Sequence, residues 1–155
     1  MQLYTEADAW GHVEATFKLA VCLHKGKGTP RDVPRAIALF RKAAGLGYLE
    51  ALVTLGECHA VGDGVPRDVS RSVELYRDAA ALGSVEAKLA LAQCHVDGHG
   101  VVRDDSQAAA LLEEAVAAGS AEAMRLLSKC YAAGKGVPKD MVKAAALRAQ
   151  AEEAL

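Results

Sequence analysis

Residues 55–68 read LGECHAVGDGVPRD, and this stretch decides the fold because it recurs at a fixed interval along the chain. The same order of leucine, cysteine, two glycines and aspartate begins again at residues 19, 91 and 127, each time without an insertion. It places one cysteine in every copy, at Cys22, Cys58, Cys94 and Cys130. Self-similarity at one period of 20–50 residues is the signature of a repeat architecture.

Each copy predicts two helices. In the second copy, apolar residues three and four apart indicate an amphipathic helix, namely Ala51, Leu52, Leu55, Cys58 and Val61. Gly62 is a suitable end for this helix, because glycine accepts the left-handed conformation of a helix cap. Asp68 is a suitable start for the next helix, because its carboxylate can accept from free backbone N–H groups.

This pattern, extended over the chain, predicts an all-α fold with no strand. We expect first helices over 12–25, 48–61, 84–97 and 120–133, and second helices over 33–46, 69–82, 105–118 and 141–154. One helix pair cannot bury its own apolar stripe, so the pairs should stack. The expected fold is a right-handed α-solenoid of four antiparallel helix pairs. We expect one domain over 1–155, with repeats at about 12–47, 48–83, 84–119 and 120–155.

The repeat resembles the Sel1-like repeat, a relative of the tetratricopeptide repeat. The resemblance rests on LG-x-CH-x-x-G-x-G-VP-x-D followed by SV-x-LY-x-x-AA-x-LG, and it covers nearly the whole chain. The copies depart from the pattern at Thr29, Val102 and Arg148. The resemblance implies a protein-interaction function, with the first helix of each pair on the concave face.

The two ends also carry the pattern. Residues 3–10 align with the second helix of the first copy, so we expect a partial preceding second helix there; alternatively, the chain is a fragment of a longer array. Arg148 and Glu152 stand where earlier copies carry core residues. Polar residues in these columns are typical of a terminal cap.

Composition excludes several classes of partner. The chain has 155 residues, 18 basic and 20 acidic, and a net charge of −2. This balance does not favour nucleic acid or an anionic membrane surface. No apolar run approaches the ~20 residues of a membrane span, and the first residues lack the features of a signal peptide. We therefore expect a monomer located in the cytoplasm, unless a leader was trimmed.

The cysteines predict core positions rather than chemistry. Equivalent residues of stacked helices lie about 8–10 Å apart, beyond the ~7 Å Cα limit of a disulfide. We expect each cysteine to be a small buried hydrophobe. Cys58 and His59 point about 100° apart on a helix and cannot share one metal ion. Structural zinc sites normally have close Cys or His pairs in loops, and a site shared across repeats by His59, His95 and Tyr131 would lack them. We expect no metal and no cofactor.

Catalytic motifs are missing from the sequence: there is no G-x-S-x-G, Walker loop or H-E-x-x-H. The protein is therefore not expected to be an enzyme. The remaining enzymatic alternative is a hydrolase acting on cell-wall compounds, as suggested for cysteine-rich relatives. Those relatives pair cysteines within a repeat, whereas this chain has one per repeat.

The candidate partner-binding residues lie in columns of the first helices that should face outward. The first column, which begins at Glu14, is acidic. Its alternative interpretation, without any partner, is that each glutamate places a favourable negative charge near a helix N-terminus. The second column, which begins at Phe17, is mostly apolar. Its residues would belong to the core if the outward face of the helix were assigned one position away. The three columns are Glu14, Glu50, Glu86 and Glu122; Phe17, Val53, Leu89 and Arg125; and Val21, Glu57, Gln93 and Lys129. A fourth contains His24, Ala60, Val96 and Ala132.

The sequence thus favours an adaptor or scaffold that binds a segment of another protein on the concave face. One alternative is a bacterial toxin-inhibiting (immunity) or effector protein that uses the same surface. Another is a purely structural or engineered array, although the copies differ at most surface columns.

Overall fold

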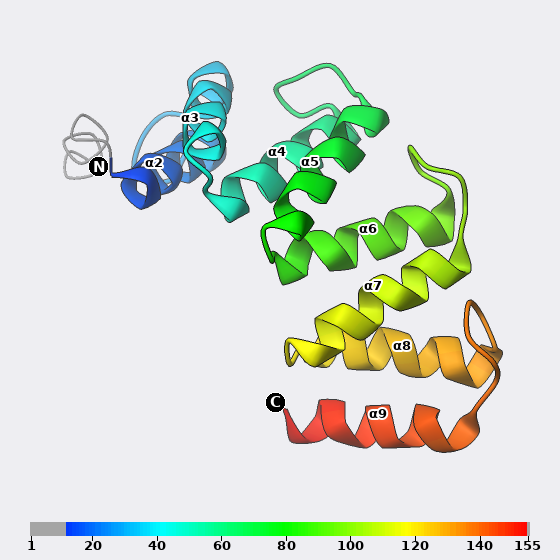
Figure 1. Cartoon of the computed structure of the whole chain (residues 1–155). Coiled ribbons are helices and arrows are strands. Elements are labelled where there is room, and N and C mark those ends of the chain that lie inside the picture. Colours follow the sequence, from blue (N-terminus) through cyan, green and yellow to red (C-terminus); the bar gives the residue numbers. More distant parts are fainter. Residues whose placement is uncertain (1–11, 155) are drawn as a thin grey trace. The chain divides into compact units, whose positions relative to one another are not determined.

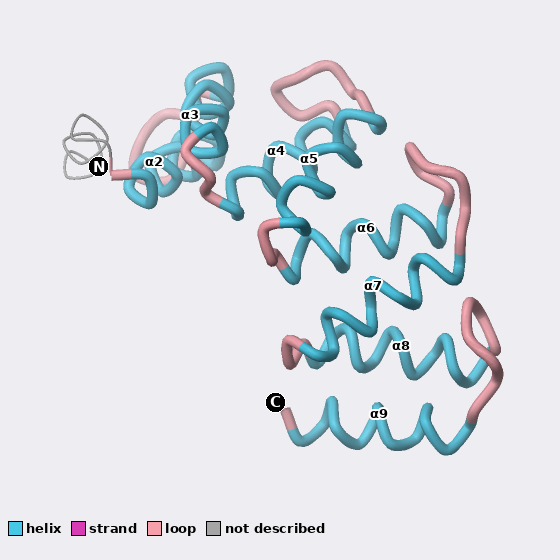
Figure 2. The backbone as a smooth tube through the Cα atoms, viewed as in Figure 1, coloured by secondary structure: helices cyan, strands magenta, loops and turns pink. Residues whose placement is uncertain are grey.

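The computed structural model describes residues 12–154, which form eight helices and no strand. The helices alternate as first and second members of four pairs, whose arrangement along the chain can be followed in Figures 1 and 2. Their bounds are α2 Val13–Lys25, α3 Val33–Gly45, α4 Leu49–Val61, α5 Val69–Ala81, α6 Val85–Asp97, α7 Asp105–Ala117, α8 Ala121–Ala133 and α9 Met141–Glu153. The predicted all-α repeat fold is confirmed, and each helix agrees with its predicted range to within one residue at either end. The helix predicted for residues 3–10 lies outside the described residues.

Local capping explains these bounds. Gly62 follows α4 with φ +80°, and its N–H donates to the carbonyl of Cys58. The carboxylate of Asp68 accepts from the backbone N–H of Arg71 at 2.9 Å and starts α5. The same two devices recur in the other copies, at Gly26 and Asp32, Gly98 and Asp104, and Gly134 and Asp140.

The chain divides into two compact units, Met1–Leu82 and Gly83–Leu155. In the first unit, α2 pairs with α3 and α4 with α5, while α3 packs on α4 and joins the two pairs. Its core contains large side chains such as Leu19, Phe40, Leu55 and Val73, each less than 5% exposed.

The second unit repeats this arrangement with a smaller set of core residues. Helix α6 pairs with α7 and α8 with α9, and α7 packs on α8. Most of the core consists of alanines, which allow close helix packing; its members are Ala92, Ala108, Ala109, Leu112, Ala115, Ala123 and Leu127. On α9, Arg148 and Glu152 are exposed, and only Ala144 and Ala151 are buried.

The cysteines lie nearer the surface than predicted. Cys58 is buried, whereas Cys22, Cys94 and Cys130 are only half-buried, so the expectation of a fully buried column is wrong for three of them. All four are free thiols. The buried column lies three residues earlier, at Leu19, Leu55, Leu91 and Leu127. Three residues correspond to about 300° of rotation, which carries the cysteine to the edge of the core.

Candidate functional site

The predicted acidic column is exposed in every repeat. Glu14, Glu50, Glu86 and Glu122 all lie in the first turn of a first helix, where a negative charge interacts favourably with the helix dipole. Lys18 Nζ lies 2.7 Å from Glu14 Oε1, and this hydrogen bond and charge lower the pKa of Glu14.

The second column lies at the edge of the core. Phe17, Val53 and Leu89 are half-buried, while Arg125 is exposed. The ring of Phe17 has its centroid 5.6 Å from that of Phe40 and 5.1 Å from that of Tyr48. The sequence left two alternatives for this column, an outward-facing strip or part of the core. The half-buried side chains lie between these two alternatives.

The third column is mostly exposed, and the fourth is half-buried throughout. Glu57, Gln93 and Lys129 are exposed, whereas Val21 is half-buried. The fourth column consists of His24, Ala60, Val96 and Ala132. Exposed polar residues thus alternate with half-buried residues along one side of α4 and of α6.

In the first unit, parts of these columns line a groove between α2 and α4, here called the α2/α4 groove. Its volume is about 550 Å³. The wall on α2 includes Phe17, Val21 and His24, and Phe40 of α3 contributes to the lining. The other wall comes from α4 and the turn after it, through Thr54, Glu57, Cys58, Val61 and Asp63.

The second unit has a corresponding groove between α6 and α8, here called the α6/α8 groove. Its volume is about 230 Å³. Apolar lining residues include Ala92, Val96, Ala108, Leu112 and Leu126. Polar and charged residues also line it, namely Gln93, Asp105, Lys129 and Lys135.

The two grooves are built from equivalent positions. Eight of the ten positions that line the α2/α4 groove recur, two repeats further along, in the lining of the α6/α8 groove. Cys58 corresponds to Cys130, and Val61 to Ala133. The groove is therefore a product of the repeat itself, formed where one first helix lies beside the next.

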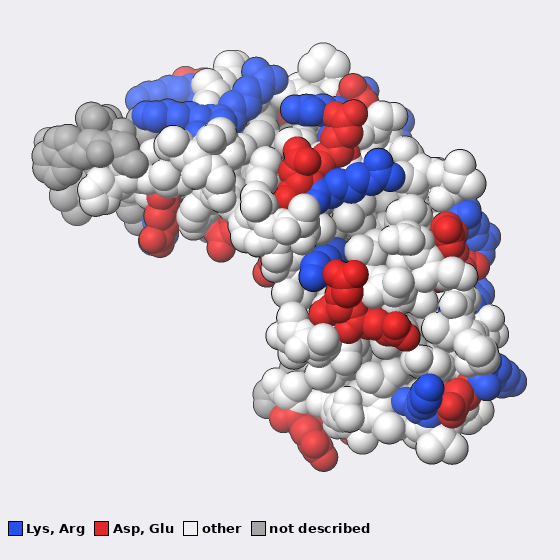
Figure 3. Space-filling model, viewed as in Figure 1, with Lys and Arg blue, Asp and Glu red and all other residues white. Residues whose placement is uncertain are grey.

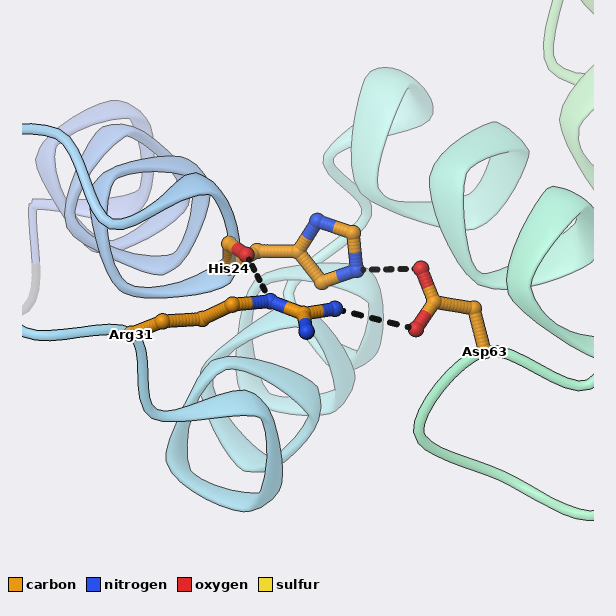
Figure 4. Close-up of polar contacts among 3 residues, drawn as sticks. All are labelled: His24, Arg31 and Asp63. Carbon is orange, nitrogen blue, oxygen red and sulfur yellow. Dashed lines mark hydrogen bonds and ion pairs between the residues drawn. The ribbon is translucent and has the colours of Figure 1, made fainter.

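The charges of the two grooves differ at these equivalent positions. In the α2/α4 groove, Asp63 Oδ2 lies 3.0 Å from His24 Nε2, and Asp63 Oδ1 lies 3.5 Å from Arg31 Nη2. Arg31 Nε also donates to the carbonyl of His24 at 2.9 Å (Figure 4). This network connects α2 to the turn that follows α4.

In the α6/α8 groove, Val96 replaces the histidine and Lys135 replaces the aspartate. Within the part of the chain that the structure describes, neither Lys135 nor Lys129 has an ion-pair partner. Asp105 contributes to the wall, with its Oδ2 lying 3.2 Å from Arg103 Nη2. Its Oδ1 is buried and has no hydrogen-bond partner among residues 12–154.

Sequence reasoning found the helix columns but missed the turn residues. Arg31, Asp63 and Lys135 could not be predicted because helical periodicity says nothing about turns, and Asp105 could not because it begins the second helix α7 and lies outside the columns of the first helices. A usable signal was present: position 63 carries aspartate and its equivalent two repeats later carries lysine, within an otherwise constant Gly-x-Gly turn.

The site offers little for catalysis or metal binding. Burial raises the pKa of the thiols of Cys58, Cys94 and Cys130, which disfavours the nucleophilic thiolate. Across residues 12–154, no three His, Cys, Asp or Glu side chains are grouped so that they could hold a metal ion. Acidic and basic side chains are interspersed on the visible surface rather than gathered in a field of one sign (Figure 3). None of the described helices is long and apolar enough to span a bilayer.

Comparison with known proteins identifies the repeat. The Sel1 repeat model matches residues 13–48, 49–84, 85–120 and 121–151. A search of curated proteins found no match. Among solved structures, a protective antigen of uropathogenic Escherichia coli that displays an SLR fold is 28% identical, with a TM-score of 0.94 over 98% of this chain and 32% of the antigen.

Two further structures are similar. A Sel1 repeat protein from Oxalobacter formigenes is 29% identical, with a TM-score of 0.93 over 98% of this chain and 62% of that protein. Cysteine-rich protein B of Helicobacter pylori is 24% identical, with a TM-score of 0.66 over 80% of this chain and 94% of that protein, and shows the fold alone. This chain therefore spans less than two thirds of the E. coli and Oxalobacter proteins.

Proposed function

The chain belongs to the Sel1 repeat family, and on that premise we propose that it is a non-enzymatic adaptor whose grooves between successive first helices bind a segment of another protein. Sel1 repeat proteins are generally scaffolds for protein interactions. The proposal adds the place of binding, which is the α2/α4 groove and the α6/α8 groove, each taken within its own unit.

One observation carries the proposal: the same groove is built twice from equivalent residues. In each copy, the lining combines buried or half-buried apolar side chains with polar side chains, several of which are exposed. Apolar pockets with a few polar groups at the edge are typical binding sites for side chains of a partner. The acidic column adds further polar groups to the helices that line the grooves, with Glu50 on α4 and Glu122 on α8.

The helical walls favour binding without a large ordering cost. Each groove lies between first helices that end in a left-handed glycine, and the second helices packed against them begin at an aspartate cap. A preformed surface loses little conformational freedom when it binds, so more of the contact energy remains as affinity. The interaction would be passive recognition rather than a conformational switch.

The four free thiols also support the cytoplasmic location that we propose. Four unpaired cysteines are typical of a compartment that keeps thiols reduced. The pKa of three of these thiols is raised, so less of the reactive thiolate forms. This supports a role in packing rather than in reaction with a substrate.

A peptide selection with blocked grooves tests the proposal. Val61 and Ala133 occupy equivalent exposed positions at the two grooves. Val61→Trp and Ala133→Trp should cover the grooves without disturbing the core. The control is Leu46→Trp with Leu82→Trp, which likewise introduces two tryptophans, at residues 56% and 61% exposed that follow the second helices.

Random 12-residue peptides displayed on phage are selected against the wild-type protein, and binding of each enriched peptide is measured by fluorescence anisotropy. We expect V61W/A133W to lose binding and L46W/L82W to retain it. Peptides that bind both double variants equally well would overturn the grooves as the binding site. Failure to enrich any peptide above the unselected library would count against the binding function itself.

A further inference from the structure

The α6/α8 groove differs from its counterpart by two reversals of charge. Glu57 and Asp63 belong to the α2/α4 groove, and their equivalents in the α6/α8 groove are Lys129 and Lys135. Most of the surrounding lining keeps its positions, although their side chains also differ, for example His24 against Val96 and Thr54 against Leu126.

The α2/α4 groove already satisfies much of its charge internally. Asp63 interacts with both His24 and Arg31, at 3.0 Å and 3.5 Å. By contrast, Lys129 is exposed on α8, and Lys135 is exposed in the turn that follows. Neither lysine has an ion-pair partner within residues 12–154, so both remain available to an anionic ligand.

The apolar part of the α6/α8 groove has room for a side chain. Its volume of about 230 Å³ exceeds the ~150 Å³ of an engineered apolar cavity that holds benzene. Val96, Leu112 and Leu126 supply apolar walls. A leucine, methionine or phenylalanine side chain therefore fits the size and chemistry of the space.

Asp105 supplies a third element. Arg103 offsets its charge through Oδ2, at 3.2 Å, while Oδ1 is buried without a hydrogen-bond partner among the described residues. Arg103 thus reduces the repulsion that Asp105 would exert on an anionic segment, which leaves Lys129 and Lys135 as the charges that such a segment meets.

We infer that the α6/α8 groove binds an acidic peptide segment that inserts one apolar side chain between flanking Asp or Glu residues. The apolar side chain lies against Val96, Leu112 and Leu126, and the flanking carboxylates meet Lys129 and Lys135. This inference rests on the proposed function and names the class of partner that one of the two grooves selects.

The test uses the peptides selected as described above, with charge variants of the full chain. Lys129→Glu and Lys135→Asp place at each position the residue that its equivalent carries at Glu57 and Asp63, so the repeat accommodates them. The matched control is Arg41→Glu with Arg77→Glu, which changes the net charge by the same amount on exposed positions of α3 and α5 outside both grooves. Circular dichroism confirms that each variant is folded.

The inference expects enriched peptides in which an apolar residue is flanked by Asp or Glu. K129E/K135D should weaken their binding by about tenfold or more, because two attractive rim charges become repulsive, whereas R41E/R77E should leave the dissociation constant within about twofold. A133W alone should abolish their binding, and V61W alone should not. The affinity should fall as salt is raised, since exposed charges are screened.

The outcomes separate the two proposals. Enriched peptides without acidic residues, or acidic peptides that K129E/K135D binds as well as the wild type, would overturn the inference. So would acidic peptides lost with V61W but retained with A133W. In these cases the groove-binding function stands, provided that V61W/A133W still abolishes binding. If no peptide is enriched, both the inference and the proposed function are overturned.

Discussion

His24 Nε2 lies 3.0 Å from Oδ2 of Asp63, and this contact connects α2 of the first repeat to the turn after α4 of the second. Arg31 approaches the other oxygen of the same carboxylate at 3.5 Å. A single turn residue therefore joins two successive repeats by polar contacts, in addition to the packing of α3 on α4. In the second unit, the equivalent positions hold Val96 and Lys135, which cannot form this network.

The network predicts a measurable contribution to stability. Asp63→Asn removes the negative charge and should lower the free energy of unfolding by about 0.5–1.5 kcal/mol, since the groups are partly exposed. Urea unfolding at neutral pH measures the change. Glu74→Gln serves as the control, because it removes the exposed Arg71–Glu74 pair within one helix, worth about 0.3–0.5 kcal/mol. An effect of D63N no larger than that of E74Q would contradict the inter-repeat role.

The turn glycine of the second repeat should be more sensitive than that of the first. Gly64 has φ +75°, and an added Cβ would lie 2.9 Å from Ile37 Cγ1 and also against Val33. Gly64→Ala should therefore cost about 2–4 kcal/mol, combining backbone strain with overpacking between repeats.

Gly28→Ala is the matched control for this substitution. Its φ is +72°, but an added Cβ would meet no other described atom within 4 Å, so only the strain of about 1–2 kcal/mol applies. Thermal and urea unfolding compare the two variants. Equal losses of stability would show that Gly64 does not determine how closely the repeats pack.

Phe17 should contribute to both stability and groove shape. Because its half-buried ring packs on Phe40 and Tyr48, Phe17→Ala should lower the free energy of unfolding by about 1.5–3 kcal/mol, less than for a fully buried phenylalanine. The neighbouring Lys18→Ala shortens an exposed side chain that pairs with Glu14 and should cost much less stability than F17A. If F17A were as stable as K18A, Phe17 would instead be a free outward residue of the kind that the column pattern first suggested.

Thiol reactivity should report the raised pKa values. Alkylation requires the thiolate, and burial raises the pKa of Cys58, Cys94 and Cys130. At pH 8, iodoacetamide should therefore modify these residues more slowly in the native protein than in urea, by about tenfold for each unit by which the pKa is raised. Mass spectrometry assigns the rates residue by residue.

The same shifts have a consequence for stability. A thiol whose pKa is higher in the folded state stabilises the fold fully below the unfolded pKa, and this contribution is lost as the pH rises through the folded pKa. Because the pKa of these thiols is higher in the native protein than in urea, the native alkylation rate should keep rising at a pH where the rate in urea has levelled off. Equal native and denatured rates at pH 8 would contradict the burial of these thiols.

The helix bounds could be predicted from sequence because they depend on local signals. Gly62 and Asp68 end and begin helices through contacts within a few residues of themselves, and each repeat supplies the same pair. The depth of Cys94 and Cys130 could not be predicted, since it depends on how far one helix rotates against the next. The pattern of apolar residues leaves that rotation uncertain by about one position.

The grooves could be predicted only in part. Glu57, Gln93 and Lys129 were found because they share a column on first helices, and the structure places all three in groove linings. Asp63, Asp105 and Lys135 were missed because they come from turns and from the start of a second helix. Which turn lies beside which first helix is a property of stacking between repeats, not of periodicity within one.

The most direct test of the account is a two-dimensional ¹H–¹⁵N NMR titration of the full chain with a peptide selected against it. The account predicts that the largest chemical-shift changes occur at groove residues, such as Gln93, Lys129 and Ala133 for an acidic peptide, while Arg41 and Arg77 on the second helices change little. Largest changes on the second helices, with the groove residues unaffected, would contradict the claim that the grooves between first helices bind the partner.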